Sequence, residues 1–281
     1  MERRTVWILN LDAELEWSGQ AVSADVLSGL PSVARAAALD LLGPGDVLLG
    51  ERVEPGDLGR AWCPTESTRA RFLNAGITPE ASPDLHVVRR ANERGTWSQH
   101  GLVQDDSHWV TEASALDGLL QSFPVGTRLR AKRLFTVAGR GQLKITTGSL
   151  SEANRGWIRR SLAMGGLTVE PEREVLREWS MHAWLEAGGS LKLGSPVQQI
   201  LQQGHWLGSM PATELDPDDA AKLLARTRDV ADVLRAMGYF GPFGIDAMHV
   251  RESNGATRFL PLTEVNARYT LSHHASGLDE R

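Results

Sequence analysis

The stretch of residues 237–270 constrains the fold more than any other part of the chain. It contains two apolar runs of strand-like composition that flank the dipeptide Asn254-Gly255. Asn and Gly both tolerate the positive φ that a tight turn between antiparallel strands requires. The pattern therefore predicts a β-hairpin near the carboxyl end of the chain.

Polar side chains gather on this predicted hairpin. Successive side chains of a strand point to opposite faces, so Glu264, Asn266 and Arg268 project to one side. A strict two-residue turn would place Asp246 opposite Thr263, on the other face. We therefore predict an odd-numbered loop or a β-bulge that brings Asp246 to the side of Glu264. The alternative is an edge hairpin with solvent-facing polar residues, but the set of four favours a magnesium and phosphate site.

A glycine-rich segment, Ala138-Gly139-Arg140-Gly141, lies between two further strand-like runs. Glycine N–H groups can converge on a phosphate, and Lys132 before the loop and Lys144 after it would add positive charge. A plain glycine-rich hairpin is the alternative. The chain has no Walker motif, which excludes a P-loop nucleotide site, and no G-x-G-x-x-G follows its first predicted strand.

Composition excludes several classes of function. The 281 residues, 41% of them hydrophobic, can form one large domain or two to three lobes. The chain carries 35 acidic and 30 basic residues without long runs of either sign, so nucleic acid and anionic membranes are not expected partners. The single cysteine, Cys63, excludes an intrachain disulfide. No apolar stretch is long enough for a membrane span or a signal sequence, and we expect a cytoplasmic protein.

The first third of the chain has the pattern of an α/β lobe. We expect strands at 5–11, 46–50 and 85–88, and helices at 31–42, after the N-cap Thr65, and at 89–99. Asp12 and Glu14 follow the first strand, where a solvated loop is favoured over substrate contacts. Arg94 could reach a phosphate, but a surface side chain is favoured.

The remaining elements alternate between helices and strands. Helices are expected at 151–164 and 216–237, and strands at 167–171 and 178–184. In the last of these strands, Glu178, Ser180 and His182 share one face while Trp179 and Met181 share the other. We favour a His182 that is satisfied within the sheet over a general base. Residues 198–203 carry no chemical signal.

Taken together, GYFGPFGIDAMHV followed by LPLTEVNARYT resembles the signature of ATP-grasp enzymes. The resemblance is strong from residue 128 to 270 and loose before that. It implies an α/β protein with an α+β lid, in which residues 1–88 form a Rossmann-like lobe that precedes an ATP-grasp domain of residues 89–281. Within that domain it implies a lid at about 110–170 and a large sheet at about 171–281.

The resemblance also implies a role for individual residues. Asp246, Glu264 and Asn266 would hold the Mg²⁺ of ATP, with Arg268 near the transferred phosphate. Lys132 would bind the α- and β-phosphates and assist catalysis. The further nucleotide contacts implied are Gly139, Arg140, Gly141 and Lys144 at the phosphates, Glu170 at the adenine and Glu178 at the ribose. The additional upstream basic residue of many relatives has no identified match here, and the lid loop is short.

The activity implied by the resemblance is that of an ATP-dependent ligase. Such an enzyme joins a carboxylate to an amine through an acyl phosphate and releases ADP and phosphate. The expected partners are therefore small molecules, and homodimers are common among the relatives. A non-catalytic ATP-binding module and a kinase of the same fold remain as alternatives.

Overall fold

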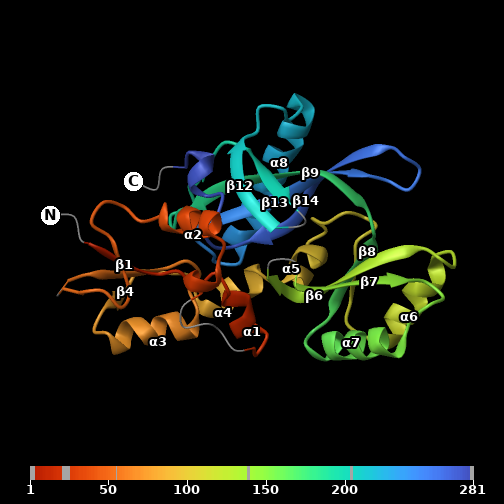
Figure 1. Cartoon of the computed structure of the whole chain (residues 1–281), viewed down its shortest axis with the longest axis horizontal. Coiled ribbons are helices and arrows are strands. Elements are labelled where there is room, and N and C mark those ends of the chain that lie inside the picture. Colours follow the sequence, from red (N-terminus) through yellow and green to blue (C-terminus); the bar gives the residue numbers. More distant parts are fainter. Residues whose placement is uncertain (1–3, 21–25, 55, 138–139, 203–204, 279–281) are drawn as a thin grey trace.

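The computed structural model describes residues 4–20, 26–54, 56–137, 140–202 and 205–278. These residues form three β-sheets that follow one another along the chain (Figure 1). We call them the first sheet, the middle sheet and the large sheet. No helix among the described residues combines the length and the apolar character needed to cross a membrane.

The first sheet is parallel, with the strand order β2-β1-β3-β4. It lies at the red and orange end of the chain in Figure 1. A capping box of Thr65 and Thr68 starts the predicted helix after Thr65. The elements of this region are β1 (Thr5–Ile8), α1 (Ala13–Trp17), the 3₁₀ helix η1 (Leu27–Gly29), α2 (Ser32–Leu39), β2 (Val47–Leu48), β3 (Leu58–Ala61), α3 (Glu66–Asn74), β4 (Thr78–Pro79) and α4 (Leu85–Ala91).

The strand expected at residues 85–88 is wrong, because this segment begins α4. The β-branched Val87 and Val88 suggested a strand, but the Asp84 side chain accepts a hydrogen bond from the His86 N–H at 2.8 Å and caps the helix. Burial of Val88 then stabilises the helical conformation. The helix expected at 89–99 is divided at Asn92, whose side-chain oxygen accepts a hydrogen bond from the Ala267 N–H at 3.0 Å.

The middle sheet is antiparallel, with the strand order β5-β8-β6-β7. Its apolar face, which includes Leu129, Ala131 and Ile145, forms a core with α6 and α7. The alternating residues, including Arg130 and Lys132, therefore point to the opposite face. The elements here are α5 (Arg94–Gln99), β5 (His108–Val110), α6 (Ala113–Ser122), β6 (Arg128–Val137), β7 (Arg140–Thr146), α7 (Glu152–Ala163) and β8 (Leu167–Pro171).

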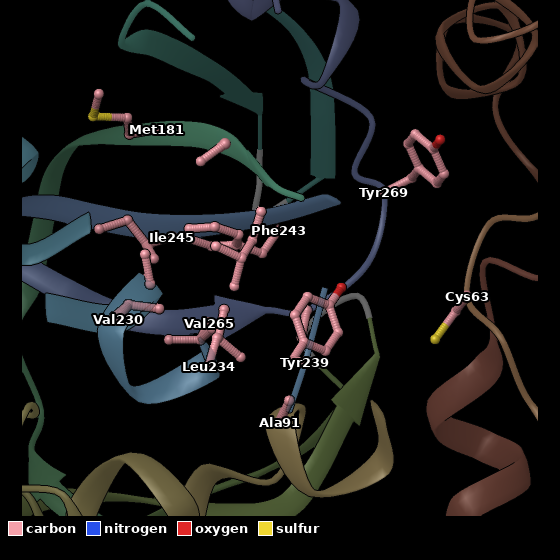
Figure 2. Close-up of a cluster of buried hydrophobic side chains, with 14 of the residues drawn as sticks. Cys63, Ala91, Met181, Val230, Leu234, Tyr239, Phe243, Ile245, Val265 and Tyr269 are labelled. Atoms are coloured by element: carbon pink, nitrogen blue, oxygen red, sulfur yellow. The ribbon is translucent and has the colours of Figure 1, made fainter. Parts of the chain in front are cut away.

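The large sheet has the strand order β12-β11-β9-β13-β14, and β10 pairs with β9. Helix α8 covers one of its faces, and Figure 2 shows Val230 and Leu234 of this helix against Phe243 and Ile245 of β13. The same core reaches Cys63 after the first sheet, so the first and large sheets are joined by shared apolar packing. The elements are β9 (Glu174–Leu185), β10 (Leu191–Leu193), β11 (Val197–Gln202), β12 (His205–Pro211), α8 (Pro217–Ala236), β13 (Gly241–Arg251), β14 (Thr257–Asn266) and the 3₁₀ helix η2 (His274–Ser276).

Strands β13 and β14 form the hairpin predicted from Asn254-Gly255. Arg251 pairs with Thr257, which leaves the odd-numbered loop 252–256. The register shifts once more between Asp246 and Met248, so the hairpin has both irregularities where the sequence predicted one or the other. As a result Asp246 lies directly opposite Glu264. The prediction that the two carboxylates share one face is confirmed.

Candidate functional site

The face of the large sheet opposite α8 carries a group of carboxylates. Asp246 pairs with Glu264 on β14 and with Ser180 on β9, and Glu178 lies two residues before Ser180 on the same face. The Asn266 amide donates a hydrogen bond to Asp246 Oδ2 at 3.1 Å. We call this set, Glu178, Asp246, Glu264 and Asn266, the acid face.

The carboxylates of the acid face repel one another. Desolvation is the largest cause that raises the pKa of Asp246 to about 7, and the charges of Glu264 and Glu178 raise it further. Hydrogen bonds from Asn266 and Gln199 oppose this shift only in part. The pKa of Glu178 is also raised, by desolvation first and then by Glu264. The negative charges of this face are only partly compensated. They would therefore stabilise a cation placed there.

The donor set of the acid face fits a hard divalent cation. Both Asp246 oxygens accept one hydrogen bond each and keep a second lone pair. Asn266 turns its amide nitrogen to Asp246, and no hydrogen bond within the described part of the chain involves its amide oxygen. No three His, Cys, Asp or Glu side chains of the described residues gather closely enough to hold a metal ion by themselves. A Mg²⁺ ion here would accordingly need the Asn266 oxygen, water or ligand oxygens as well.

Arg94 belongs to the site, so the expectation of a surface arginine is wrong. Its side chain is only 11% exposed. Its guanidinium donates hydrogen bonds to Glu264 Oε1 at 2.7 Å and to Thr136 Oγ1 at 2.6 Å. Arg94 is the first residue of α5, which contacts both β6 and β14. This helix therefore places the Arg94 guanidinium between the middle and large sheets.

Lys132, Arg130 and Lys144 lie on the polar face of the middle sheet, and each of these three is paired with a carboxylate. Lys132 Nζ lies 2.5 Å from Glu170. Arg130 and Lys144 bind Glu172 at 2.7 and 2.8 Å. Although desolvation opposes the shift, the hydrogen bonds from these two cations lower the pKa of Glu172 to about 2. The charges of these three cations are therefore compensated by nearby carboxylates.

One small cavity lies between the middle and large sheets. It is bounded by Lys132, Glu170, Arg94 and Glu264 and has a volume of about 30 Å³. Its lining includes Glu264 but neither Asp246 nor Asn266, so this cavity lies at one edge of the acid face.

Arg268, two residues after the end of β14, binds a carboxylate of α1. Its Nε donates a hydrogen bond to Glu14 Oε1 at 2.7 Å. Asp12 and Glu14 are 6% and 5% exposed, so the solvated loop favoured from the sequence is wrong for both. A carboxylate so deeply buried needs a charged partner, and Arg268 supplies one from the end of β14.

A second, larger cavity of about 710 Å³ lies beside Arg268. Trp62, Thr65 and Arg69 line it from the region of the first sheet. Trp184 of β9 and Phe240, directly before β13, line it from the other side. Its wall combines aromatic surface with charged groups, as is common in sites for small molecules.

The remaining predicted residues are placed as follows. Gly141 lies in β7 with a φ of +81°, whereas Gly139 and the side chain of Arg140 lie outside the described residues. His182 is buried in the sheet, and its Nε2 lies 2.7 Å from Thr270 Oγ1. Its Nδ1 has no hydrogen-bond partner among the described residues, so the expectation of a satisfied histidine holds only in part. Desolvation and His273 lower its pKa to about 3, so His182 is neutral at pH 7.

Two residues of the site were missed from the sequence. Gln199 donates a hydrogen bond from Nε2 to Asp246 Oδ1 at 2.8 Å. It belongs to a run of polar residues that gives no indication of which glutamine faces the carboxylates. Arg94 is the other, because helical periodicity alone does not show which face of α5 meets a neighbouring sheet.

Comparison of the chain with known proteins gives no sequence relative but a clear structural likeness. No protein-family model matches the chain, and no curated protein matches it. The N5-carboxyaminoimidazole synthetase of Staphylococcus aureus, complexed with ADP, is similar with a TM-score of 0.58 and 13% identity, over 98% of this chain and 73% of that one.

Two further solved structures are similar over nearly the whole chain. D-alanyl-alanine synthetase A of Vibrio cholerae has a TM-score of 0.56 and 16% identity, over 95% of this chain and 89% of that one. The carboxyaminoimidazole ribonucleotide synthase of Aspergillus clavatus, complexed with ATP, has a TM-score of 0.51 and 12% identity, over 95% and 71%. At these identities the similarity shows a shared fold.

Proposed function

Because the chain has the ATP-grasp fold, we propose that it is an ATP- and Mg²⁺-dependent ligase that joins a carboxylate to an amine. The observation that carries this proposal is the acid face, whose carboxylates lie opposite the cations of the middle sheet. Such an arrangement suits a nucleoside triphosphate with its divalent cation, because the metal meets the carboxylates and the phosphates meet the lysines and arginines. The solved structures with ADP and ATP support the same assignment.

We assign the metal-binding role to Asp246, Glu264 and Asn266. Their oxygens are hard ligands, and the raised pKa of Asp246 indicates a site that gains free energy from a cation. When bound, Mg²⁺ would neutralise phosphate charge and so favour transfer of the γ-phosphoryl group. Glu264 would exchange its contact with Arg94 for this role.

We assign the phosphates to Lys132, Lys144 and the loop of Gly139, Arg140 and Gly141. Lys132 must then leave Glu170, to which it is bound at 2.5 Å. Arg94 would supply the upstream basic residue for which the sequence offered no match, since its guanidinium already lies beside Glu264. Glu170 and Glu178 remain the proposed contacts for adenine and ribose.

The proposed reaction has two steps. A substrate carboxylate oxygen attacks the γ-phosphorus, ADP leaves, and an acyl phosphate forms. The amine nitrogen then attacks the acyl carbon, phosphate leaves, and the nitrogen loses a proton to give the amide. Arg268 would stabilise the charge that develops at the transferred phosphate, and the cavity of about 710 Å³ beside it would hold the substrates.

These proposed roles divide the chain into three functional segments. Residues 1–88 would contribute to the substrate cavity, residues 110–170 would form the lid, and residues 171–281 would carry the acid face. The middle sheet, from β5 to β8, corresponds to the proposed lid.

The direct test is turnover with ATP, Mg²⁺ and a panel of amino acids, other small carboxylates and amines. Phosphate release that requires both a carboxylate and an amine would support the ligase. A stable phosphorylated product would instead indicate a kinase, and tight ATP binding without product under every pairing would indicate a binding module. Asp246→Asn should abolish turnover, whereas Asp232→Asn on the exposed surface of α8 serves as the matched control.

A further inference from the structure

Gln199 binds the side chain of Asp246, although the strands of these two residues are not adjacent in the sheet. Gln199 lies on β11, and Asp246 lies on β13, on the other side of β9. Nevertheless, Gln199 Nε2 donates a hydrogen bond to Asp246 Oδ1 at 2.8 Å. The side chain must therefore cross the face of β9 to reach the carboxylate.

The residues of β9 leave room for this crossing. Ser180 pairs with Val197 on one side and with Asp246 on the other, so it lies between β11 and the carboxylate. Its side chain is short, it is 1% exposed, and its hydroxyl has no partner in the described part of the chain. A large side chain at this position would occupy the path that Gln199 follows.

We propose that Gln199 is a positioning residue that orients the Asp246 carboxylate for a divalent cation. The inference rests on the metal site proposed above. Asn266 holds one oxygen of Asp246 and Gln199 holds the other, so the plane of the carboxylate is fixed from two sides. Partners of this kind around a metal ligand raise affinity by fixing its orientation before the metal arrives.

The neutral character of Gln199 matters for this role. Glu264 is held by Arg94, and Glu172 is held by Arg130 and Lys144. Asp246 differs from these two carboxylates, because its hydrogen-bond donors among the described residues are both side-chain amides. An amide donor fixes a carboxylate without cancelling its charge, so Asp246 keeps its attraction for a cation, whereas a lysine in the place of Gln199 would compete with the metal.

The experiment compares Gln199→Leu with Gln198→Leu in the full chain. Gln198 lies on the opposite face of β11 and pairs with Trp179 and Met210, so its substitution is the matched control. Calorimetry measures ATP affinity without metal and with increasing Mn²⁺, and electron paramagnetic resonance measures free Mn²⁺. Thermal unfolding of the metal-free proteins checks that both variants are folded.

For Gln199→Leu we expect the Mn²⁺ concentration for half-maximal binding to rise about tenfold. The ATP affinity without metal should stay within about twofold of the wild type, because Gln199 touches a metal ligand and no phosphate contact. Gln198→Leu should resemble the wild type in both measurements.

Two results would overturn the inference while leaving the proposed function intact. One is an unchanged Mn²⁺ requirement in Gln199→Leu, and the other is an equal loss of affinity with and without metal, which is the outcome for a purely structural link between β11 and β13. A wild-type protein whose ATP binding ignores Mn²⁺ would overturn the metal site and this inference together.

Discussion

Asp246 on the large sheet and Glu172 beside the middle sheet are both carboxylates, yet their pKa values move in opposite directions. The pKa of Asp246 rises to about 7, whereas that of Glu172 falls to about 2. Desolvation disfavours the charge of both. The difference lies in their partners, because Asp246 has two amides and two neighbouring acids, while Glu172 has Arg130 and Lys144. Cations of the middle sheet thus compensate Glu172, whereas Asp246 has no cationic partner among the described residues.

The opposite shifts imply opposite effects of pH on the free energy of unfolding. The native pKa of Asp246 lies above its ordinary value of 3.8, so the native protein binds more protons and loses stability as pH rises from about 4 to about 7. The native pKa of Glu172 lies below its ordinary value of 4.5, so its contribution is present above that pH and is lost as pH falls toward 2.

Asp246→Asn is the substitution with the largest expected effect. Removing a metal-binding carboxylate is expected to lower turnover by about three orders of magnitude, which steady-state kinetics would measure. The same substitution should raise the unfolding midpoint of the metal-free protein at pH 8, because it removes a desolvated charge. A variant that keeps wild-type turnover, or that is less stable at pH 8, would contradict the account.

Lys132→Met tests the role of the cations on the middle sheet. We expect ATP affinity to fall about 10- to 100-fold both with and without Mg²⁺, because a lysine contact to phosphate does not depend on the metal. Lys192→Met is the control, since Lys192 pairs with Glu186 on the surface. If the loss appeared only in the presence of Mg²⁺, Lys132 would belong to the metal site and not to the phosphate site.

The pH dependence of metal binding tests whether the raised pKa of Asp246 controls the affinity for the metal. With a pKa of about 7, Asp246 is mostly protonated at pH 6 and mostly ionised at pH 8. We therefore expect the Mg²⁺ concentration for half-maximal ATP binding to be about tenfold higher at pH 6 than at pH 8. Calorimetry at the two pH values measures this ratio. The same Mg²⁺ requirement at both values would mean that Asp246 is not the titrating ligand.

The smallest effect concerns stability near the middle sheet. Glu172→Gln leaves Arg130 and Lys144 without their carboxylate and should lower the free energy of unfolding by about 1 kcal/mol. Urea unfolding at pH 7 measures the change. Glu174→Gln is the control, because its pair with Arg251 is exposed and should contribute close to zero. Equal effects of the two substitutions would show that the Glu172 pairs are no stronger than a surface pair.

The sequence was sufficient for those parts of the fold that local patterns determine. Asn254-Gly255, the Thr65 cap and the Asp216-Pro217 helix start each depend on residues close together in the chain. The face shared by Asp246 and Glu264 could also be predicted, because strand alternation left only an odd loop or a bulge as solutions. The prediction of a strand at 85–88 is wrong, because a helix cap and tertiary burial outweigh the preference of β-branched side chains for strands.

Contacts between distant segments could not be predicted in this way. The Arg94–Glu264 and Glu14–Arg268 pairs join residues far apart in the sequence, and each depends on how one element docks against another. Gln199 is the clearest example, because its role follows from the order of strands in the large sheet and from the small side chain of Ser180.

Calorimetric titration of the protein with ATP at pH 8, with Mg²⁺ and with a chelator, tests the central claim most directly. If the acid face gathers a divalent cation to hold the triphosphate, the wild type should bind ATP at least about tenfold more tightly with Mg²⁺, and Asp246→Asn should lose this difference. Equal affinities in the wild type under both conditions, or a full Mg²⁺ effect in Asp246→Asn, would contradict it.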